Sequence, residues 1–216
     1  MLTLPFDDDR RSLRVLALGA HADDIEIGCG GTILRLAQAY PELHVHWVVL
    51  SGSTARADEA RASAEAFLDG VPERQIAVHD FRDGYFPYLG GAVKDVFERL
   101  KSEVAPDVIL THHRHDLHQD HRHVCELTWN TFRDHLILEY EVPKYDGDLG
   151  APNFFVHLSK TTCERKITII MEHFATQLDR RWFTDDLFRS LLRLRGMESN
   201  APEGSAEAFY CRKLAV

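Results

Sequence analysis

The sequence predicts an α/β protein in which a mostly parallel β-sheet is covered by helices on both faces. Short apolar runs alternate with amphipathic helical segments along most of the chain, the usual pattern of a parallel sheet with helical connections. The 216 residues suit one large domain, and 44% hydrophobic with 27% charged residues is typical of a soluble globular protein. Polar clusters follow two of the apolar runs, where a parallel sheet would carry a site.

The elements follow from the apolar spacing in chain order. Residues 13–18 are predicted to form a fully buried strand, and further strands are predicted at 45–50, 75–78, 108–111 and 136–140. Helices are predicted at 32–40, 57–68, 93–104, 124–132, 166–176 and 184–194, with Pro41, Gly70 and Pro72 as stop signals. This order predicts a Rossmann-like, three-layer αβα fold. We expect one domain over residues 1–216, in which residues 136–216 are an elaboration.

Composition and charge argue against several classes of protein. The net charge of −9 argues against a broad nucleic-acid surface. No apolar run is long enough to span a bilayer, and residues 1–11, with three aspartates and two arginines, lack the apolar core of a signal peptide. The four cysteines (Cys29, Cys125, Cys163 and Cys211) show no CxxC pairing, as expected of free thiols. We therefore expect a cytoplasmic protein, and a homo-oligomer stays open.

Two polar clusters are the candidate functional residues. His21, Asp23 and Asp24 come just after the first predicted strand, and six of the thirteen histidines lie within residues 112–123, just after the strand at 108–111. Sites in parallel α/β sheets form outside the carboxyl ends of strands, so the two clusters are expected to face one crevice. Imidazole and carboxylate are the ligands that zinc prefers, so the sequence predicts a metal site.

A catalytic zinc ion needs about three protein ligands and an open position. His21, His121 and one of the two aspartates would supply these ligands. The spacing leaves the choice of aspartate open. If the loop stays extended, His21 and Asp23 share a side, whereas a helix that begins at Asp23 would make His21 and Asp24 neighbours. The other aspartate could accept a proton.

Two further residues of the second cluster are candidates for supporting roles. His118 would lie one helical turn before His121 and could stabilise negative charge on a substrate oxygen. Asp120 could orient one of the ligand histidines from behind.

Three motifs together resemble the LmbE-like, or PIG-L, deacetylase family. They are His-Ala-Asp-Asp at residues 21–24, Arg-x-x-Glu-Ala at 56–60 and His-x-Asp-His at 118–121. The family includes the enzyme that deacetylates N-acetylglucosaminyl-phosphatidylinositol, and bacterial enzymes that deacetylate glycoside precursors of mycothiol and bacillithiol. This chain differs at Ala22 and Gln119, where the family usually or often has proline.

The resemblance assigns roles to the matching residues. It makes His21, Asp24 and His121 the zinc ligands, Asp23 the general base and His118 the group that stabilises the oxyanion. It also implies that the fold is Rossmann-like and that the substrate is an N-acetylated amino sugar or glycoside.

Substrate contacts are expected from residues near the crevice. Arg56 and Asp83 stand where family members contact the sugar. The segment 139–153 follows a predicted strand and carries Tyr145, which can lie against a sugar ring, and Asp146, which can accept hydroxyl hydrogen bonds. We expect residues 136–216 to shape the substrate site. Lys144, in the same segment, and Arg56 could meet a phosphate or carboxylate.

The sequence therefore predicts a zinc-dependent de-N-acetylase, with Fe²⁺ as an alternative metal because both ions accept this ligand set. One rival is a metal-dependent phosphoesterase, which would need a second metal ion, with Asp116 as the obvious further ligand. Another is an inactive sugar-binding relative, against which the intact motifs argue. Gly28, Gly30 and Gly31 resemble half of a dinucleotide-binding motif, but we attribute them to tight helix–sheet packing.

Overall fold

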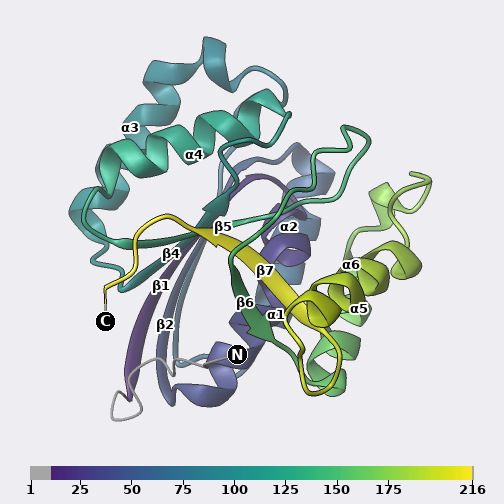
Figure 1. The fold of residues 1–216 in the computed structure, drawn as a ribbon. Helices are drawn as coiled ribbons and strands as arrows, with labels where there is room; N and C mark the ends of the chain where they lie inside the picture. Colours follow the sequence, from purple (N-terminus) through teal and green to yellow (C-terminus); the bar gives the residue numbers. More distant parts are fainter. Residues whose placement is uncertain (1–10, 216) are drawn as a thin grey trace.

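Seven strands form one sheet in the computed structural model, which describes residues 11–215 (Figure 1). Their order across the sheet is β3-β2-β1-β4-β5-β7-β6. The bounds are β1 Ser12–His21, β2 Glu42–Ser51, β3 Glu73–Val78, β4 Val108–His112, β5 Leu136–Tyr140, β6 Phe154–His157 and β7 Ala206–Cys211. The first five strands are parallel, and β7 is antiparallel to both of its neighbours. The mostly parallel α/β sheet confirms the predicted fold class.

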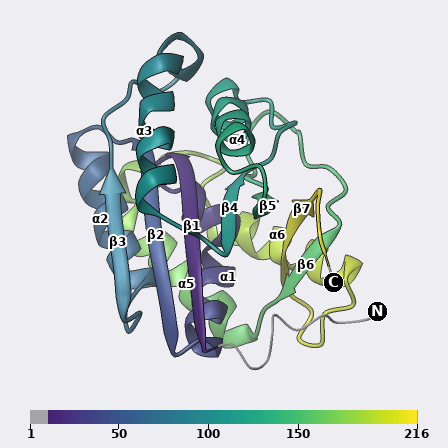
Figure 2. The same ribbon diagram turned by 90° about the vertical axis from the view of Figure 1, so that its left-hand side faces the viewer.

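Helices cover both faces of the sheet, as Figures 1 and 2 show. One face carries α1 (Asp24–Ala39), α2 (Thr54–Phe67), α5 (Lys160–His173) and α6 (Asp185–Glu198), and the other carries α3 (Gly90–Glu103) and α4 (Gln119–Thr131). Short 3₁₀ turns lie at Phe86–Tyr88 (η1) and Ala175–Gln177 (η2). Val15 and Ala17 pack into the first core, whereas Leu16 and Leu18 pack into the second. This alternation follows from the two-residue period of a strand.

The first helix begins earlier than its apolar pattern predicts. It starts at Asp24, eight residues before the expected start at Thr32, because its glycine-rich first half is packed instead of being a loop. A Cβ atom at Gly28 would lie 2.1 Å from the Tyr140 ring, and one at Gly30 would lie 2.6 Å from the Phe67 ring. Close packing thus outweighs the helix cost of glycine, about 1 kcal/mol per residue. The packing interpretation of these glycines agrees with the structure.

The last third of the chain contributes two strands that the sequence analysis missed. β6 has only four residues, and β7 contains alanine and glutamate, which are uncommon in strands. Glu207 of β7 is buried and accepts a hydrogen bond of 2.6 Å from Lys166 of α5, and its other carboxyl oxygen accepts one of 2.6 Å from the Thr32 amide. These bonds fix the last third to α1, the helix that begins at the candidate site.

Three expectations concern the chain as a whole. None of the helices within residues 11–215 is long and apolar enough to cross a membrane. The expectation about a signal peptide falls on residues 1–11, nearly all of which lie outside the described part. The four cysteines are free thiols, three of them buried, as expected.

Candidate active site

His21 and Asp24 are brought together by the turn between β1 and α1. Asp23 has a φ of 92°, in the left-handed region that aspartate tolerates better than most residues, and it is the N-cap of α1. The turn lets the His21 amide donate a hydrogen bond of 2.7 Å to Oδ2 of Asp24. The helix therefore begins at the aspartate pair, and the geometry favours His21 and Asp24 as neighbours.

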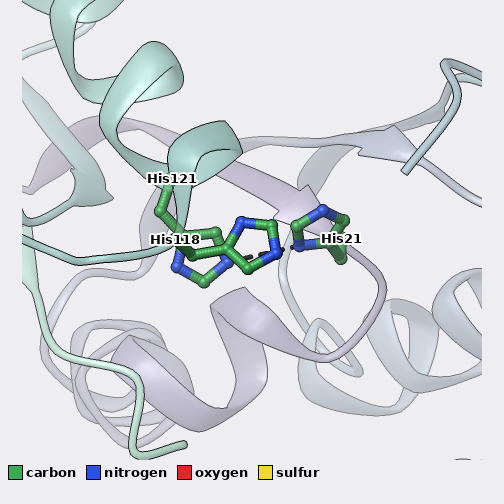
Figure 3. Close-up of side chains that lie close together, drawn as sticks. All are labelled: His21, His118 and His121. Carbon is green, nitrogen blue, oxygen red and sulfur yellow. Dashed lines mark hydrogen bonds between the residues drawn. The ribbon is translucent and has the colours of Figure 1, made fainter. Parts of the chain in front are cut away.

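Three side-chain atoms form a compact triangle at the carboxyl edge of the sheet. His21 Nδ1 lies 3.2 Å from His121 Nε2 and 3.4 Å from Asp24 Oδ2, and the latter two atoms lie 3.5 Å apart. Ligand atoms of a tetrahedral zinc site, with bonds of about 2.1 Å, are about 3.4 Å apart. The donor set and its spacing therefore fit one such ion. Figure 3 shows the His21 and His121 rings turned toward one another, with His118 beside them.

In both His21 and His121, the ring nitrogen that points away from the triangle faces a carboxylate. His21 Nε2 lies 3.2 Å from Asp120 Oδ2 and 3.1 Å from Asp83 Oδ1, and His121 Nδ1 lies 2.9 Å from Asp116 Oδ2. A carboxylate in this position fixes the ring and the tautomer, leaving the inner nitrogen free to bind a metal. Asp120 is buried while Asp83 is exposed, so Asp120 is the fixed partner of His21 and Asp83 is the one open to a ligand.

Asp120 also holds the loop that follows β3. Its carboxylate accepts hydrogen bonds from the backbone amides of Gly84, at 2.7 Å, and Phe86, at 3.1 Å. The loop carrying Asp83 is thereby fixed beside His21.

Asp116 is a residue whose role the sequence analysis missed. In addition to its contact with His121, Asp116 accepts a hydrogen bond of 2.8 Å from the His118 amide. It also forms an ion pair of 3.0 Å with Lys144. Burial alone would raise the pKa of Asp116, but the hydrogen bond and charge of His121 hold it below its ordinary value. Asp116 thus supports His121 and is not free for a second metal ion. Lys144 is bound to it, and to Asp148 at 2.6 Å, instead of facing a substrate.

His112 is the second missed residue. It is completely buried, its ring stacks on His121 with the centroids 3.9 Å apart, and its Nε2 lies 3.3 Å from Asp24 Oδ2. The Ala20 amide donates a hydrogen bond of 2.9 Å to the same nitrogen. Because the lone pair of Nε2 accepts this hydrogen bond, His112 is a weaker candidate for a metal ligand than His21. Asp24, His112 and His121 nevertheless form a second group that could hold a metal ion.

Charge around Asp24 favours its ionised form. Burial alone would raise the pKa of Asp24, but the neighbouring His121 and His112 and a hydrogen bond from His21 hold it well below its ordinary value. A carboxylate held ionised among histidines is ready to bind a cation.

His118 is placed as a neutral hydrogen-bond donor. It is the N-cap of α4, which begins at Gln119, five residues before the predicted helix start, and its Nδ1 accepts the Asp120 amide at 3.3 Å. An accepting Nδ1 leaves the proton of a neutral ring on Nε2. Burial lowers the pKa of His118, which keeps the ring neutral. Its ring centroid lies 4.8 Å from that of His21 and 4.6 Å from that of His121.

Asp23 is buried beside Arg56. The guanidinium Nη2 lies 3.2 Å from Asp23 Oδ2 and also donates to the Ala22 carbonyl. Burial raises the pKa of Asp23 to about 7, although the charge of Arg56 opposes this. Arg56 therefore orients Asp23.

A cleft opens beside these residues. It has a volume of about 1080 Å³ and is lined by residues that include His21, Ser51, Arg56, His79, Asp83 and Arg180, and we call it the His21 cleft. Arg56 and Asp83 thus line the cleft beside His21, and their contact with a substrate stays a prediction. Tyr145 and Asp146 are not among its lining residues. Tyr145 is 74% exposed, and its role and that of Asp146 in substrate binding stay predictions.

Fold and site together define a Rossmann-like α/β protein with a histidine–aspartate site suited to one metal ion. The chain belongs to the PIG-L family, whose model is described as GlcNAc-PI de-N-acetylase and matches residues 16–132. The resemblance seen in the motifs is thereby confirmed.

Two curated relatives and one similar solved structure are named as deacetylases. The chain is 30% identical to an uncharacterised deacetylase, YaiS, of Escherichia coli over 138 residues, which cover 60% of this chain and 74% of the relative. It is 28% identical to the diacetylchitobiose deacetylase of Thermococcus kodakarensis over 134 residues, covering 55% of this chain and 48% of that enzyme. The structure of the N,N'-diacetylchitobiose deacetylase from Pyrococcus horikoshii matches with a TM-score of 0.73 at 23% identity, covering 94% of this chain and 84% of that one, which shows a shared fold.

Proposed function

We propose that this protein is a metal-dependent de-N-acetylase that hydrolyses the N-acetyl amide of an amino sugar or glycoside and releases acetate. The observation that carries the proposal is the triangle of His21 Nδ1, Asp24 Oδ2 and His121 Nε2, with edges of 3.2, 3.4 and 3.5 Å. Membership of a deacetylase family supports the reaction.

His21, Asp24 and His121 would hold the ion, zinc or ferrous iron. When bound, such an ion lowers the pKa of a water molecule toward neutrality and polarises a carbonyl oxygen. The outer carboxylates Asp120 and Asp116 would keep the two histidines in the required tautomers, because each faces the nitrogen that does not point to the centre.

The remaining side chains would move the protons and stabilise charge. Asp23 would take a proton from the attacking water molecule and return it to the amide nitrogen as the C–N bond breaks, giving acetate and a free amine. Arg56 holds the Asp23 carboxylate in place for both steps. His118 would donate its Nε2 proton in a hydrogen bond to the carbonyl oxygen as negative charge develops there.

For the substrate, we propose a chemical class and not a particular molecule. Two relatives are named for diacetylchitobiose, an N-acetylated disaccharide, which supports an amino-sugar substrate here. Asp83, exposed at the rim of the His21 cleft, is the proposed acceptor for a sugar hydroxyl. We also propose that residues 1–216 act as a single domain and that residues 136–216, including Tyr145 and Asp146, shape the substrate site.

The proposal is tested by acetate release from a panel of N-acetylated sugars, nucleotide sugars and lipid-linked sugars, with added zinc and, anaerobically, with ferrous iron. We expect at least one substrate to release acetate in a metal-dependent manner, and Asp23→Asn to lose that activity. Release of phosphate without acetate would instead identify a phosphoesterase. Sugar binding with no turnover under any metal condition would identify an inactive relative.

A further inference from the structure

The His21 cleft has a charge opposite to that of the chain. Four of its lining residues are arginines (Arg56, Arg61, Arg82 and Arg180), against two aspartates (Asp80 and Asp83), whereas the whole protein has a net charge of −9. A cleft that gathers one sign of charge concentrates ligands of the other sign. The excess of arginines therefore points to an anionic ligand.

Two of these charged residues already contact residues of the candidate active site. Arg56 is paired with Asp23 at 3.2 Å, and Asp83 lies 3.1 Å from His21. The positive charge left for a ligand therefore belongs to Arg61, Arg82 and Arg180.

The three remaining arginines have no carboxylate within ion-pair distance in the part of the chain that the structure covers. Arg61 of α2 donates only to the Val78 carbonyl, at 3.2 Å. Arg82, in the loop after β3, lies over the Tyr85 ring, with its guanidinium carbon 3.6 Å from the ring centroid. Their guanidinium groups therefore keep free donors for a phosphate or carboxylate, which they can bind in a bidentate manner.

Arg180 reaches the cleft from the C-terminal third. It follows η2, and that turn is fastened to α2 because Glu59 accepts hydrogen bonds from the Thr176 amide, at 2.8 Å, and from the Thr176 hydroxyl, at 2.6 Å. Arg61, Arg82 and Arg180 thus come from three segments far apart in the sequence and line one cleft.

We propose that Arg61, Arg82 and Arg180 bind an anionic group of the substrate, a phosphate or a carboxylate, while its acetamide lies at the metal site. The inference rests on the proposed function and narrows it to N-acetylated amino sugars that carry an acidic substituent. Ser53 and Thr54 line the same cleft, and their hydroxyls can donate hydrogen bonds to oxygens of the anion.

The first test compares acidic and neutral substrates. N-acetylglucosamine 1-phosphate and 6-phosphate provide a phosphate, N-acetylmuramic acid provides a carboxylate, and methyl N-acetylglucosaminide is neutral. We expect at least one acidic substrate to exceed the neutral one by about tenfold or more in kcat/KM, the scale of a charge-assisted hydrogen bond. The advantage should shrink as salt is raised. Equal values for all four substrates would overturn the proposal.

The arginines are then tested directly. Arg61→Gln combined with Arg180→Gln should lower kcat/KM for the preferred acidic substrate about tenfold and leave that of the neutral substrate within about twofold. Arg133→Gln, which changes an exposed arginine outside the cleft, is the matched control. A fall of the same size for both substrates would show that the two arginines support the fold and not an anion.

A binding measurement separates this inference from the proposed reaction. Inorganic phosphate is titrated into the metal-free protein, so that a metal ion cannot bind it, and its dissociation constant is measured by calorimetry. The double variant should bind phosphate at least about tenfold more weakly than the wild type and the Arg133→Gln control. If no substrate releases acetate but this difference is present, the anion site stands and the deacetylase proposal fails. If the wild type and double variant bind phosphate alike, the anion site is refuted.

Discussion

The Nδ1 atom of His121 lies 2.9 Å from Oδ2 of Asp116, five residues earlier in the chain. The contact directs the opposite nitrogen of His121 toward His21 and Asp24. It also explains why Asp116 is buried although it lies in a turn rich in polar residues, since the carboxylate is further satisfied by the His118 amide and by Lys144. A carboxylate that holds a metal-binding histidine in this way usually raises the affinity of the site for its ion.

Replacing Asp116 should therefore weaken metal binding without abolishing it. Asp116→Asn removes the negative charge behind His121, and we expect zinc affinity to fall by about 10- to 100-fold, measured by competition with a chelator. Asp148→Asn is the control, because Asp148 binds the same lysine but not His121. Equal losses in the two variants would indicate that the loop, and not the His121 contact, matters.

Asp23 is expected to act on protons and not on the metal. Asp23→Asn should keep one metal equivalent and lose turnover by about 100-fold or more, the usual scale for general acid–base catalysis. Metal content is measured in the same preparations as acetate release. Should metal and activity disappear together, the roles of Asp23 and Asp24 would have to be exchanged.

His118 is expected to act on the transition state. Removing its Nε2 donor in His118→Ala should lower kcat about 100-fold with little change in KM, because the developing oxyanion is stabilised only in the transition state. Steady-state kinetics on the best substrate of the panel separates the two constants. A change confined to KM would make His118 a substrate-binding residue.

Glu26 should make the metal-free protein less stable as the pH rises. It is completely buried in α1, and neither carboxyl oxygen makes a hydrogen bond within residues 11–215. Burial raises its pKa from 4.5 to about 8. Between these pH values the folded state keeps a proton that the unfolded state has released. The free energy of unfolding therefore falls as the pH rises through this range.

Glu26→Gln removes this titration. Urea unfolding in the presence of a chelator should show that the stability of the variant relative to the wild type increases from about pH 5 to about pH 8. Glu126→Gln, at an exposed position of α4, should show no such trend. A difference between Glu26→Gln and the wild type that is constant with pH would mean that Glu26 is ionised in the fold.

The sequence predicted the parts of the fold that depend on local periodicity. The five parallel strands alternate with helices whose apolar spacing is clear, so their order along the chain could be assigned. The two antiparallel strands could not, because β6 is short and β7 is held by long-range pairing and by the buried contact of Glu207 with Lys166. The start of α1 was misplaced for a similar reason, since packing against Tyr140 and Phe67, far away in the sequence, makes its glycines favourable.

The candidate site shows the same division. His21, Asp24 and His121 could be proposed because they follow strand ends and match family motifs. The roles of Asp116 and His112 depend on two contacts: Nδ1 of His121 faces Asp116, and Nε2 of His112 accepts a hydrogen bond from the Ala20 amide. These contacts form in the folded protein, and the spacing of the residues in the sequence does not encode them. The sequence suggested that Lys144 could contact a substrate, but in the fold it is paired with Asp116 and Asp148.

The most direct test of the account is a metal titration of the wild type and of the variant that combines His21→Ala, Asp24→Ala and His121→Ala. After metal removal, zinc and, anaerobically, ferrous iron are added back while bound metal and acetate release are measured. The control variant combines His115→Ala with His123→Ala, which replace two histidines of the same stretch of sequence that are not part of the triangle. We predict that the wild type and the control bind one tight equivalent that restores activity, whereas the triple variant folds, as seen by circular dichroism, but binds none. One tight equivalent in the triple variant, or full activity without metal, would contradict the account.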